Sequence, residues 1–188
     1  MIMFPTHTID SAPEGSKETL TAVEKAFGFL PNLAGKLAEA PTALDGYITL
    51  SGIFTGPKAS LSPVEQQVVL LATSAENGCT YCGAAHGLMA HGAGLSRDDV
   101  RAVQAGQKIS DSKLEALRAF ATAVVEDRGW VKEADMEAFL NAGYTHAQVL
   151  EVIVGVAVKT ITNYTNHIVR PALDDQFADF AVAEQAAE

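Results

Sequence analysis

The amino-acid sequence predicts an all-α protein, a multi-helix orthogonal bundle with no β-sheet. Apolar residues recur at intervals of three and four along nearly the whole chain, and no segment shows the alternation that is typical of a strand. Proline, glycine and capping residues divide this pattern into helix-length pieces. With 188 residues, 48% of them hydrophobic, the chain is long enough to bury a core without a metal or disulfide staple. We therefore expect one domain over residues 1–188, with N-terminal helices over 1–57, a central motif over 58–106 and C-terminal helices over 107–188.

Three helices are expected in the N-terminal part. The first spans residues 17–27 and ends at Gly28. The second, over residues 31–40, and the third, over residues 41–56, each begin with proline, which is favoured at the first helical position because its missing N–H is not needed there. The third helix is expected to turn three apolar residues inward: Leu44, Ile48 and Ile53.

The strongest helix-start signal lies in the middle of the chain. Ser62 and Glu65 have the spacing of a capping box, with Pro63 at the first helical position, and an apolar run follows as far as residue 76. The later helices are predicted from caps at their beginnings and glycine or proline at their ends, over residues 96–106, 110–126, 132–141 and 145–169. The acidic, alanine-rich remainder carries no predicted element.

The segment Thr145–His167 loosely repeats the segment Ser62–His86. Each begins with a capping residue, continues as an apolar helix and ends in a cluster of Asn, Tyr and His. A degenerate internal duplication explains this likeness, and so does chance recurrence of a common helical pattern. In the second copy, Asn163, Tyr164 and His167 either face the cysteines described below or form a polar cluster at a subunit contact.

Charge and hydropathy argue against several classes of function. The 23 acidic and 13 basic residues give a formal charge of −10, which argues against nucleic acid or an anionic membrane as a partner. The N-terminus lacks a basic region followed by a long apolar run, and the longest apolar stretch, Val149–Val158, contains Glu151 and is too short to span a bilayer. We therefore expect a cytoplasmic protein, in which a cysteine pair is more often catalytic or metal-binding than a structural disulfide.

Both cysteines of the chain lie in one motif, Cys79-Thr-Tyr-Cys82, and His86 follows four residues later. At about 3.6 residues per turn these three positions share one face of a helix, so two thiols and an imidazole can meet. Asn77 and Gly78 end any preceding helix, which puts Cys79 in the first turn of a new one. Because unsatisfied N–H groups and the helix dipole favour a thiolate there, the motif predicts a redox-active cysteine.

Two other interpretations of the motif stay open. Cys79, Cys82, His86 and His91 are the ligand types of a tetrahedral zinc site, although four ligands within positions 79–91 would be crowded. Free cysteines are also often simply buried in a core. We favour the redox interpretation and expect no metal and no cofactor.

These residues also carry a resemblance to a known family. Leu61-Ser-Pro-Val-Glu65, together with residues 77–86, resembles the core motif of the AhpD-like alkylhydroperoxidases within the carboxymuconolactone decarboxylase family. Phe29-Leu-Pro-Asn-Leu33 resembles the opening of the peroxidase-related branch, so the likeness covers most of the chain from about Phe27 to His167. The resemblance implies an AhpD-like helical fold assembled as trimers or hexamers.

The resemblance further implies a thiol peroxidase that reduces hydroperoxides and is re-reduced by a dithiol partner: a lipoyl group, a thioredoxin-like protein or a small thiol. By position, Cys82 would attack the peroxide and become a sulfenic acid, Cys79 would resolve it as a disulfide, and His86 would help to deprotonate Cys82. The chemistry fits, because a thiolate attacks the O–O bond and a neighbouring cysteine traps the sulfenic acid before further oxidation. The decarboxylase branch is less favoured, since its similar members typically lack the second cysteine, present here as Cys82.

One position departs from the family pattern. Family members commonly have a relay glutamate 12 residues before the first cysteine, whereas this chain has Gln67, and an amide cannot relay a proton as a carboxylate does. Glu76 lies three residues before Cys79 and would continue its stripe, so we predict Glu76 as the relay carboxylate. Glu65 is assigned to the capping box instead.

Two further classes of function stay open: a general thiol–disulfide oxidoreductase with weak peroxidase activity, and a redox-silent zinc-binding or assembly protein. The amide at Gln67 makes the first of these more credible. Tyr81 either binds substrate through its hydroxyl or packs in the core, and His91 either lines the site or lies on the surface. Five apolar residues are candidates for an entrance to the site, or else for core or interface: Phe4, Phe54, Leu88, Met89 and Trp130.

Overall fold

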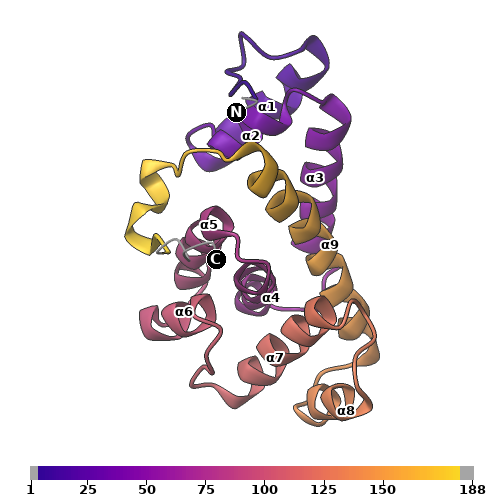
Figure 1. The fold of residues 1–188 in the computed structure, drawn as a ribbon. Coiled ribbons are helices and arrows are strands. Elements are labelled where there is room, and N and C mark those ends of the chain that lie inside the picture. Colours follow the sequence, from indigo (N-terminus) through magenta and orange to yellow (C-terminus); the bar gives the residue numbers. More distant parts are fainter. Residues whose placement is uncertain (1–3, 183–188) are drawn as a thin grey trace.

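The computed structural model describes residues 4–182, and all regular structure in that part of the chain is helical. Figure 1 shows the path of the chain. The helices are α1 (Glu14–Phe27), α2 (Asn32–Leu37), α3 (Pro41–Phe54), α4 (Pro63–Glu76), α5 (Thr80–Gly92), α6 (Arg97–Gln104), α7 (Ser112–Glu126), α8 (Glu133–Asn141), α9 (His146–Val169) and the 3-10 helix η1 (Asp175–Phe180). The all-α prediction is confirmed.

Capping residues fix the beginnings of the two helices that matter most for the site. At α4 the Ser62 hydroxyl accepts from the Glu65 backbone N–H, and the Glu65 carboxylate accepts from the Ser62 backbone N–H, which is the predicted capping box. Thr145 and Gln148 form a second capping box at α9. Such a cap contributes about 1 kcal/mol by satisfying N–H groups that the helix leaves unpaired.

Two expectations about the elements are wrong. Ile53 is 61% exposed, because apolar residues lie on more than one face of α3 and the pattern does not select the buried face. The tail contains η1, in which Phe177 and Phe180 recur at the three-residue period of a 3-10 helix and are both buried. The last part of the acidic tail, residues 183–188, lies outside the described residues.

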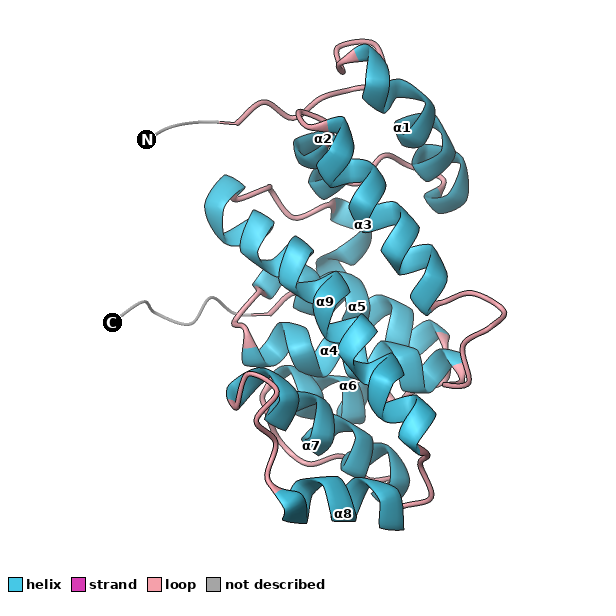
Figure 2. Cartoon of the chain, turned by 90° about the vertical axis from the view of Figure 1, so that its right-hand side faces the viewer, coloured by secondary structure: helices cyan, strands magenta, loops and turns pink. Residues whose placement is uncertain are grey.

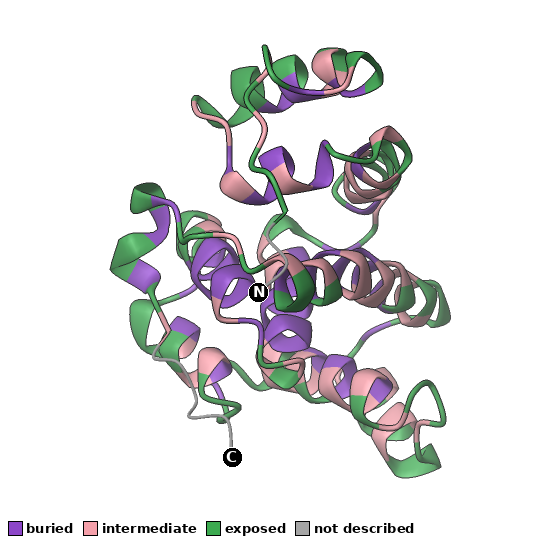
Figure 3. Cartoon of the chain, turned by 45° about the horizontal axis from the view of Figure 1, so that its top comes forward, coloured by how far each residue is buried: buried purple, intermediate pink, exposed green. Residues whose placement is uncertain are grey.

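Helix α4 runs through the middle of the molecule, with α5, α7 and α9 packed around it (Figures 1 and 3). Four consecutive residues of α4 are almost fully buried, as expected for a helix covered on every side: Val68, Val69, Leu70 and Leu71. Burying one such side chain stabilises the fold by about 1.5–3 kcal/mol. The segment that carries the cysteines therefore follows directly after α4, a helix that is buried on every side.

Helices α1, α2 and α3 form a layer of their own beside α9 (Figure 2). One hydrophobic cluster lies beneath this layer and includes the beginning of α5 with both cysteines. A second cluster surrounds α4, α7 and the first half of α9. The thiols thus belong to the first cluster, and α9 contacts α5 beside them.

After α9 the chain turns back along α5 and ties it to α2. The Asp174 carboxylate accepts from the backbone N–H of Asn32 and from the hydroxyl of Tyr81. Phe177 packs edge-on against Tyr81 and Phe29. Tyr81 is therefore a buried structural residue, and its hydroxyl is already occupied. Within residues 4–182, no helix combines the length and the apolarity that crossing a membrane would take.

Candidate active site

The cysteine motif occupies the first turn of α5. Asn77 ends α4, Gly78 turns the chain with φ of 67°, and Cys79 is the N-cap of α5, so the predicted break and new helix are confirmed. Cys82 lies three residues after Cys79, which is also the spacing between Ser62 and Glu65 in the capping box of α4. Both thiols are free and buried, with exposed fractions of 3% for Cys79 and 2% for Cys82.

One face of α9 supplies polar groups to the sulfur atoms. Asn166 Nδ2 donates to Cys79 Sγ at 3.4 Å and to Cys82 Sγ at 3.2 Å. Thr162 Oγ1 lies 3.8 Å from Cys82 Sγ, and Lys159 lies one turn earlier on the same face. Donors placed around a buried sulfur stabilise its thiolate form.

These surroundings push the two thiol pKa values apart. Burial by itself raises the pKa of Cys82, but the hydrogen bond from Cys79, the charge of Lys159 and the Thr162 hydroxyl together outweigh it and lower the pKa to about 5. The pKa of Cys79 is raised, first by its hydrogen bond to Cys82 and then by burial. These two shifts favour the thiolate on Cys82 and the protonated thiol on Cys79.

The helix-start argument alone gave the thiolate to the wrong cysteine. It favoured Cys79 because that residue begins α5, whereas the structure gives Cys79 the higher pKa. As the N-cap, Cys79 donates its thiol hydrogen to the sulfur three residues later, and Cys82 also receives the donors of α9. The first turn of α5 thus stabilises a negative charge on Cys82, the third residue of the helix.

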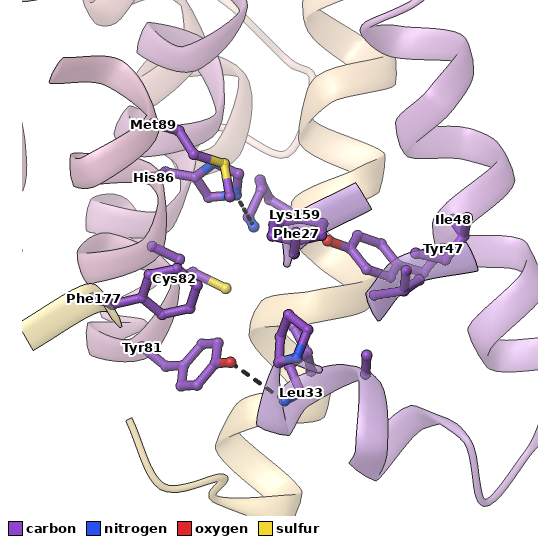
Figure 4. A pocket seen from close by; sticks show the side chains of 14 residues that line it. Phe27, Leu33, Tyr47, Ile48, Tyr81, Cys82, His86, Met89, Lys159 and Phe177 are labelled. Atoms are coloured by element: carbon purple, nitrogen blue, oxygen red, sulfur yellow. Dashed lines mark hydrogen bonds between the residues drawn. The ribbon is translucent and has the colours of Figure 1, made fainter. Parts of the chain in front are cut away.

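His86 links α5 to α4 and α9 through a chain of hydrogen bonds (Figure 4). Its Nδ1 lies 3.0 Å from Gln67 Oε1, and its Nε2 lies 2.7 Å from Lys159 Nζ. Burial, and then the charge of Lys159, lower the pKa of His86 well below its usual value, so the imidazole is neutral. Gln67 thus keeps the contact with the histidine, although it cannot carry a proton.

The structure does not bring Glu76 to the thiols. Glu76 is the last residue of α4, so the turn at Gly78 takes it off the stripe that begins with Cys79. It is exposed in a separate surface depression beside Arg118, and its pKa is raised by burial and then by Glu126. The prediction that Glu76 continues the stripe is wrong, because the periodicity of one helix was extended across a helix break.

Cys82, His86 and Lys159 line a narrow cavity of about 40 Å³ between α5, α9 and the N-terminal layer (Figure 4). Most of its wall is apolar, and the hydroxyl of Tyr47 points into it. Of the five apolar residues considered for an entrance, only Met89 lines this cavity. The lining residues are Val23, Phe27, Pro31, Leu33, Ala34, Tyr47, Ile48, Tyr81, Cys82, Ala85, His86, Met89, Lys159 and Phe177.

A second, smaller cavity of about 20 Å³ reaches Cys79 from another side. Its wall includes Gly78, Gly83 and Gln104. Cys79 does not line the larger cavity, and Cys82 does not line the smaller one. Each sulfur therefore has an approach of its own.

The remaining histidines do not join the site. His91 Nδ1 bonds to the backbone oxygen of Leu95, and its ring packs near Phe180. His167 and Tyr164 are exposed on the outer face of α9. The four zinc ligand types of the motif are thus not gathered around one point, and residues 4–182 contain no group of three or more His, Cys, Asp or Glu placed to hold a metal ion.

Of the three residues of the Asn, Tyr and His cluster of α9, only Asn163 faces the interior, and none of them bonds to a sulfur. Asn163 is buried, accepts from Asn77 Nδ2 at 3.0 Å and so ties α9 to the end of α4. The residue that touches both sulfurs is Asn166, which the sequence interpretation missed together with Lys159 and Thr162. Their signal in the sequence is a row of polar residues at helical spacing within an otherwise apolar helix.

Comparison with known proteins agrees with this geometry. Residues 36–110 match the model of the carboxymuconolactone decarboxylase family. The fold resembles that of an uncharacterized peroxidase-related protein with an alkylhydroperoxidase AhpD core from Ralstonia eutropha JMP134, with a TM-score of 0.83, 23% identity and 93% of each chain covered. No curated protein sequence matches the chain.

Two further solved structures share the fold. One is an uncharacterized peroxidase-related protein from Silicibacter sp. TM1040, with a TM-score of 0.77, 16% identity and coverage of 92% of this chain and 93% of that one. The other is the debrominase Bmp8, a cysteine-to-alanine variant in complex with 2,3,4-tribromopyrrole, with a TM-score of 0.76, 16% identity and coverage of 96% and 95%. The chain therefore has an AhpD-like fold, and its residues 36–110 match the carboxymuconolactone decarboxylase family.

Proposed function

We propose that this protein is a thiol-dependent hydroperoxide reductase in which Cys82 is the attacking residue and Cys79 the resolving one. The observation that carries the proposal is a buried free cysteine, Cys82, at the wall of an apolar cavity, with a hydrogen bond from Asn166 to its sulfur, a lowered pKa and a second free cysteine three residues before it. A thiolate is the form that attacks a peroxide, and a neighbouring thiol is what prevents further oxidation.

The cycle has two steps. The Cys82 thiolate attacks the terminal oxygen of ROOH, the O–O bond breaks, and the products are Cys82 sulfenic acid and an alkoxide that takes up one proton to become ROH. The Cys79 sulfur then attacks the Cys82 sulfur, which forms the disulfide and releases water made from the sulfenic hydroxyl and the Cys79 proton. The two electrons that the pair loses reduce one peroxide.

The cavity favours an organic hydroperoxide over hydrogen peroxide. Its wall consists mostly of apolar side chains, among them Val23, Ile48, Met89 and Phe177. An apolar R group gains about 25 cal/mol for each Å² that it buries, whereas hydrogen peroxide gains nothing from such a wall. We expect cumene hydroperoxide to react faster than hydrogen peroxide.

A dithiol closes the cycle by reducing the disulfide. Cys82, with the lower pKa, is the better leaving group, so we expect the donor to attack the Cys79 sulfur through the smaller cavity. A lipoyl group, a thioredoxin-like protein and a small thiol are the candidate donors, and a cytoplasmic setting keeps all three reduced.

The family resemblance implies that the chain assembles as a trimer or hexamer. Light scattering of the purified chain measures this oligomeric state.

The experiment is mass spectrometry of the reduced, metal-free protein after one equivalent of cumene hydroperoxide. We expect the wild type to lose two hydrogens within seconds, and Cys79→Ser to gain one oxygen as a trapped sulfenic acid. Cys82→Ser should remain unoxidised. Thiols that stay reduced in the wild type for minutes would contradict the proposal.

A second candidate function is thiol-dependent reductive debromination of an aromatic ring. The apolar cavity beside the Cys82 thiolate favours it, since a flat halogenated ring suits such a wall, and Bmp8 is a debrominase with the same fold. Release of bromide from 2,3,4-tribromopyrrole in the presence of a dithiol distinguishes this function from the first.

A further inference from the structure

Lys159 is the most unusual charged residue of the chain. Its side chain is only 1% exposed, and a lysine is seldom so deeply buried without an ionic partner. Within residues 4–182 it forms no salt bridge with a carboxylate, since the pairs there involve other residues. Its contacts are His86 and the Cys82 sulfur, whose thiolate form it stabilises by charge and by hydrogen bonding.

The direction of the hydrogen bonds at His86 follows from Gln67. An amide oxygen only accepts, so the His86 Nδ1 that lies 3.0 Å from Gln67 Oε1 carries the hydrogen. A neutral imidazole with hydrogen on Nδ1 has its lone pair on Nε2, which then accepts from the Lys159 ammonium at 2.7 Å. The only basic atom of His86 is thus already in use, and His86 is not free to deprotonate Cys82.

An ammonium has three hydrogens, and His86 takes one of them. Lys159 lines the same cavity as Cys82 and Tyr47, so the other two hydrogens are available to a group that lies in this cavity (Figure 4). Among the residues that the structure describes, no other nitrogen cation lines this cavity. The alkoxide that forms when an O–O bond breaks at Cys82 would therefore arise beside Lys159.

We propose that Lys159 is the proton donor of the reaction: its ammonium protonates the alkoxide that leaves when Cys82 attacks a hydroperoxide. His86 and Gln67 are positioning residues that hold the ammonium in place. This inference rests on the function proposed above, and it replaces the expectation that His86 acts as the base. It also explains why a relay carboxylate is dispensable, since the thiolate already exists and the missing proton is one for the leaving group.

The protons of the cycle balance under this assignment. Thiolate, ammonium and ROOH give sulfenic acid, neutral amine and ROH. Disulfide formation then uses the Cys79 proton to complete water and leaves the amine unchanged. When a dithiol reduces the disulfide, its two protons are shared: one returns to Cys79 and the other restores the Lys159 ammonium, while Cys82 leaves as the thiolate.

The test compares two oxidants that differ in their need for a proton. tert-Butyl hydroperoxide releases an alkoxide, which must be protonated, whereas peracetic acid releases a carboxylate, which is stable without a proton at neutral pH. Rates are measured in Lys159→Met and Lys159→Arg at a pH where absorbance at 240 nm shows Cys82 fully ionised in each variant. This choice of pH removes any effect of Lys159 on the thiolate population.

We expect Lys159→Met to lose about 10²–10⁴-fold in rate with tert-butyl hydroperoxide, the range typical of general acid catalysis, and less than about tenfold with peracetic acid. Lys159→Arg keeps a cation and should lose less with the alkyl hydroperoxide. An equal loss with both oxidants would overturn the inference and leave Lys159 as a stabiliser of the thiolate. A wild type that reacts with neither oxidant would overturn the proposed function as well.

A measurement on the wild type tests the inference even if Lys159→Met does not fold. Across a series of peracids and alkyl hydroperoxides, proton donation makes the rate depend weakly on the basicity of the leaving group, because the departing oxygen is neutralised as it leaves. A shallow slope of log rate against leaving-group pKa supports the inference. A steep slope, equal to that of a free thiolate in water, contradicts it.

Discussion

Replacing Cys79 should raise the pKa of Cys82 only when the new side chain cannot donate a hydrogen bond to the Cys82 sulfur. Of the groups that lower the pKa of Cys82, the hydrogen bond from Cys79 is the strongest. Cys79→Ala removes that donor, whereas Cys79→Ser keeps an O–H donor at the same position. Both variants lack the resolving thiol, so the comparison isolates the hydrogen bond to the sulfur.

The expected shift follows from the strength of a hydrogen bond to a charged group. Such a bond contributes about 1.5–3 kcal/mol, and one pKa unit corresponds to about 1.36 kcal/mol. Starting from about 5, the pKa of Cys82 should rise in Cys79→Ala by about one to two units. In Cys79→Ser it should stay within about half a unit of the wild type.

Absorbance of the thiolate at 240 nm, followed from pH 4 to 9, measures this pKa directly. The rate of alkylation by iodoacetamide over the same range confirms that the titrating group is the reactive sulfur. At pH 5.5 the rate with cumene hydroperoxide should fall in Cys79→Ala and recover as the pH rises. The reasoning is refuted if both variants titrate at the same pH as the wild type, because the thiolate would then not depend on its neighbour.

Three other predictions concern packing, the relay and pH. A Cβ at Gly155 would lie 2.7 Å from Val69, so Gly155→Ala should lower the free energy of unfolding in urea by about 1–3 kcal/mol, whereas Gly46→Ala, which meets nothing within 4 Å, should raise it by about 0.5–1 kcal/mol. Glu76→Gln should leave the rate with cumene hydroperoxide within about twofold of the wild type, and a loss of about tenfold would restore Glu76 as a relay. The folded-state pKa of His86 is lowered, so its neutral form supports folding above its unfolded pKa near 6.5, and this support is lost as the pH falls. In urea unfolding between pH 6.5 and 5, the wild type should therefore lose more stability than His86→Gln does.

The parts of the site that lie on one helix could be predicted from the sequence. Cys79, Cys82 and His86 depend only on where α5 begins and on its period, and Asn77 and Gly78 mark that beginning clearly. The same holds for most helix boundaries, because caps and prolines act within a few residues. Helical periodicity gave a wrong prediction where one helix ends and the next begins, as at Glu76.

The parts contributed by distant helices could not be predicted. Lys159 is 73 residues from His86 along the chain, and the contact exists only because α9 crosses α5 beside α4. The choice between Cys79 and Cys82 depends on the same crossing, since it brings Asn166 and Lys159 to the sulfurs. The polar residues of this face of α9 can be found in the sequence, but the sequence does not indicate what they contact.

Charge balance relates the burial of Lys159 to the neutral Gln67 and to the Cys82 thiolate. A buried ammonium is costly unless an opposite charge lies near, and the usual cost in a protein interior is several kcal/mol. A glutamate at position 67 would supply that charge through His86, but Gln67 is neutral. The compensating charge for Lys159 is therefore the Cys82 thiolate itself, which gives the low pKa of this sulfur a structural cause independent of catalysis. Oxidation of Cys82 removes the negative charge, and the ammonium is then left uncompensated in the interior. Giving its proton to the departing alkoxide relieves this imbalance at the moment it arises, so the substitution at Gln67 and the burial of Lys159 belong to the same mechanism.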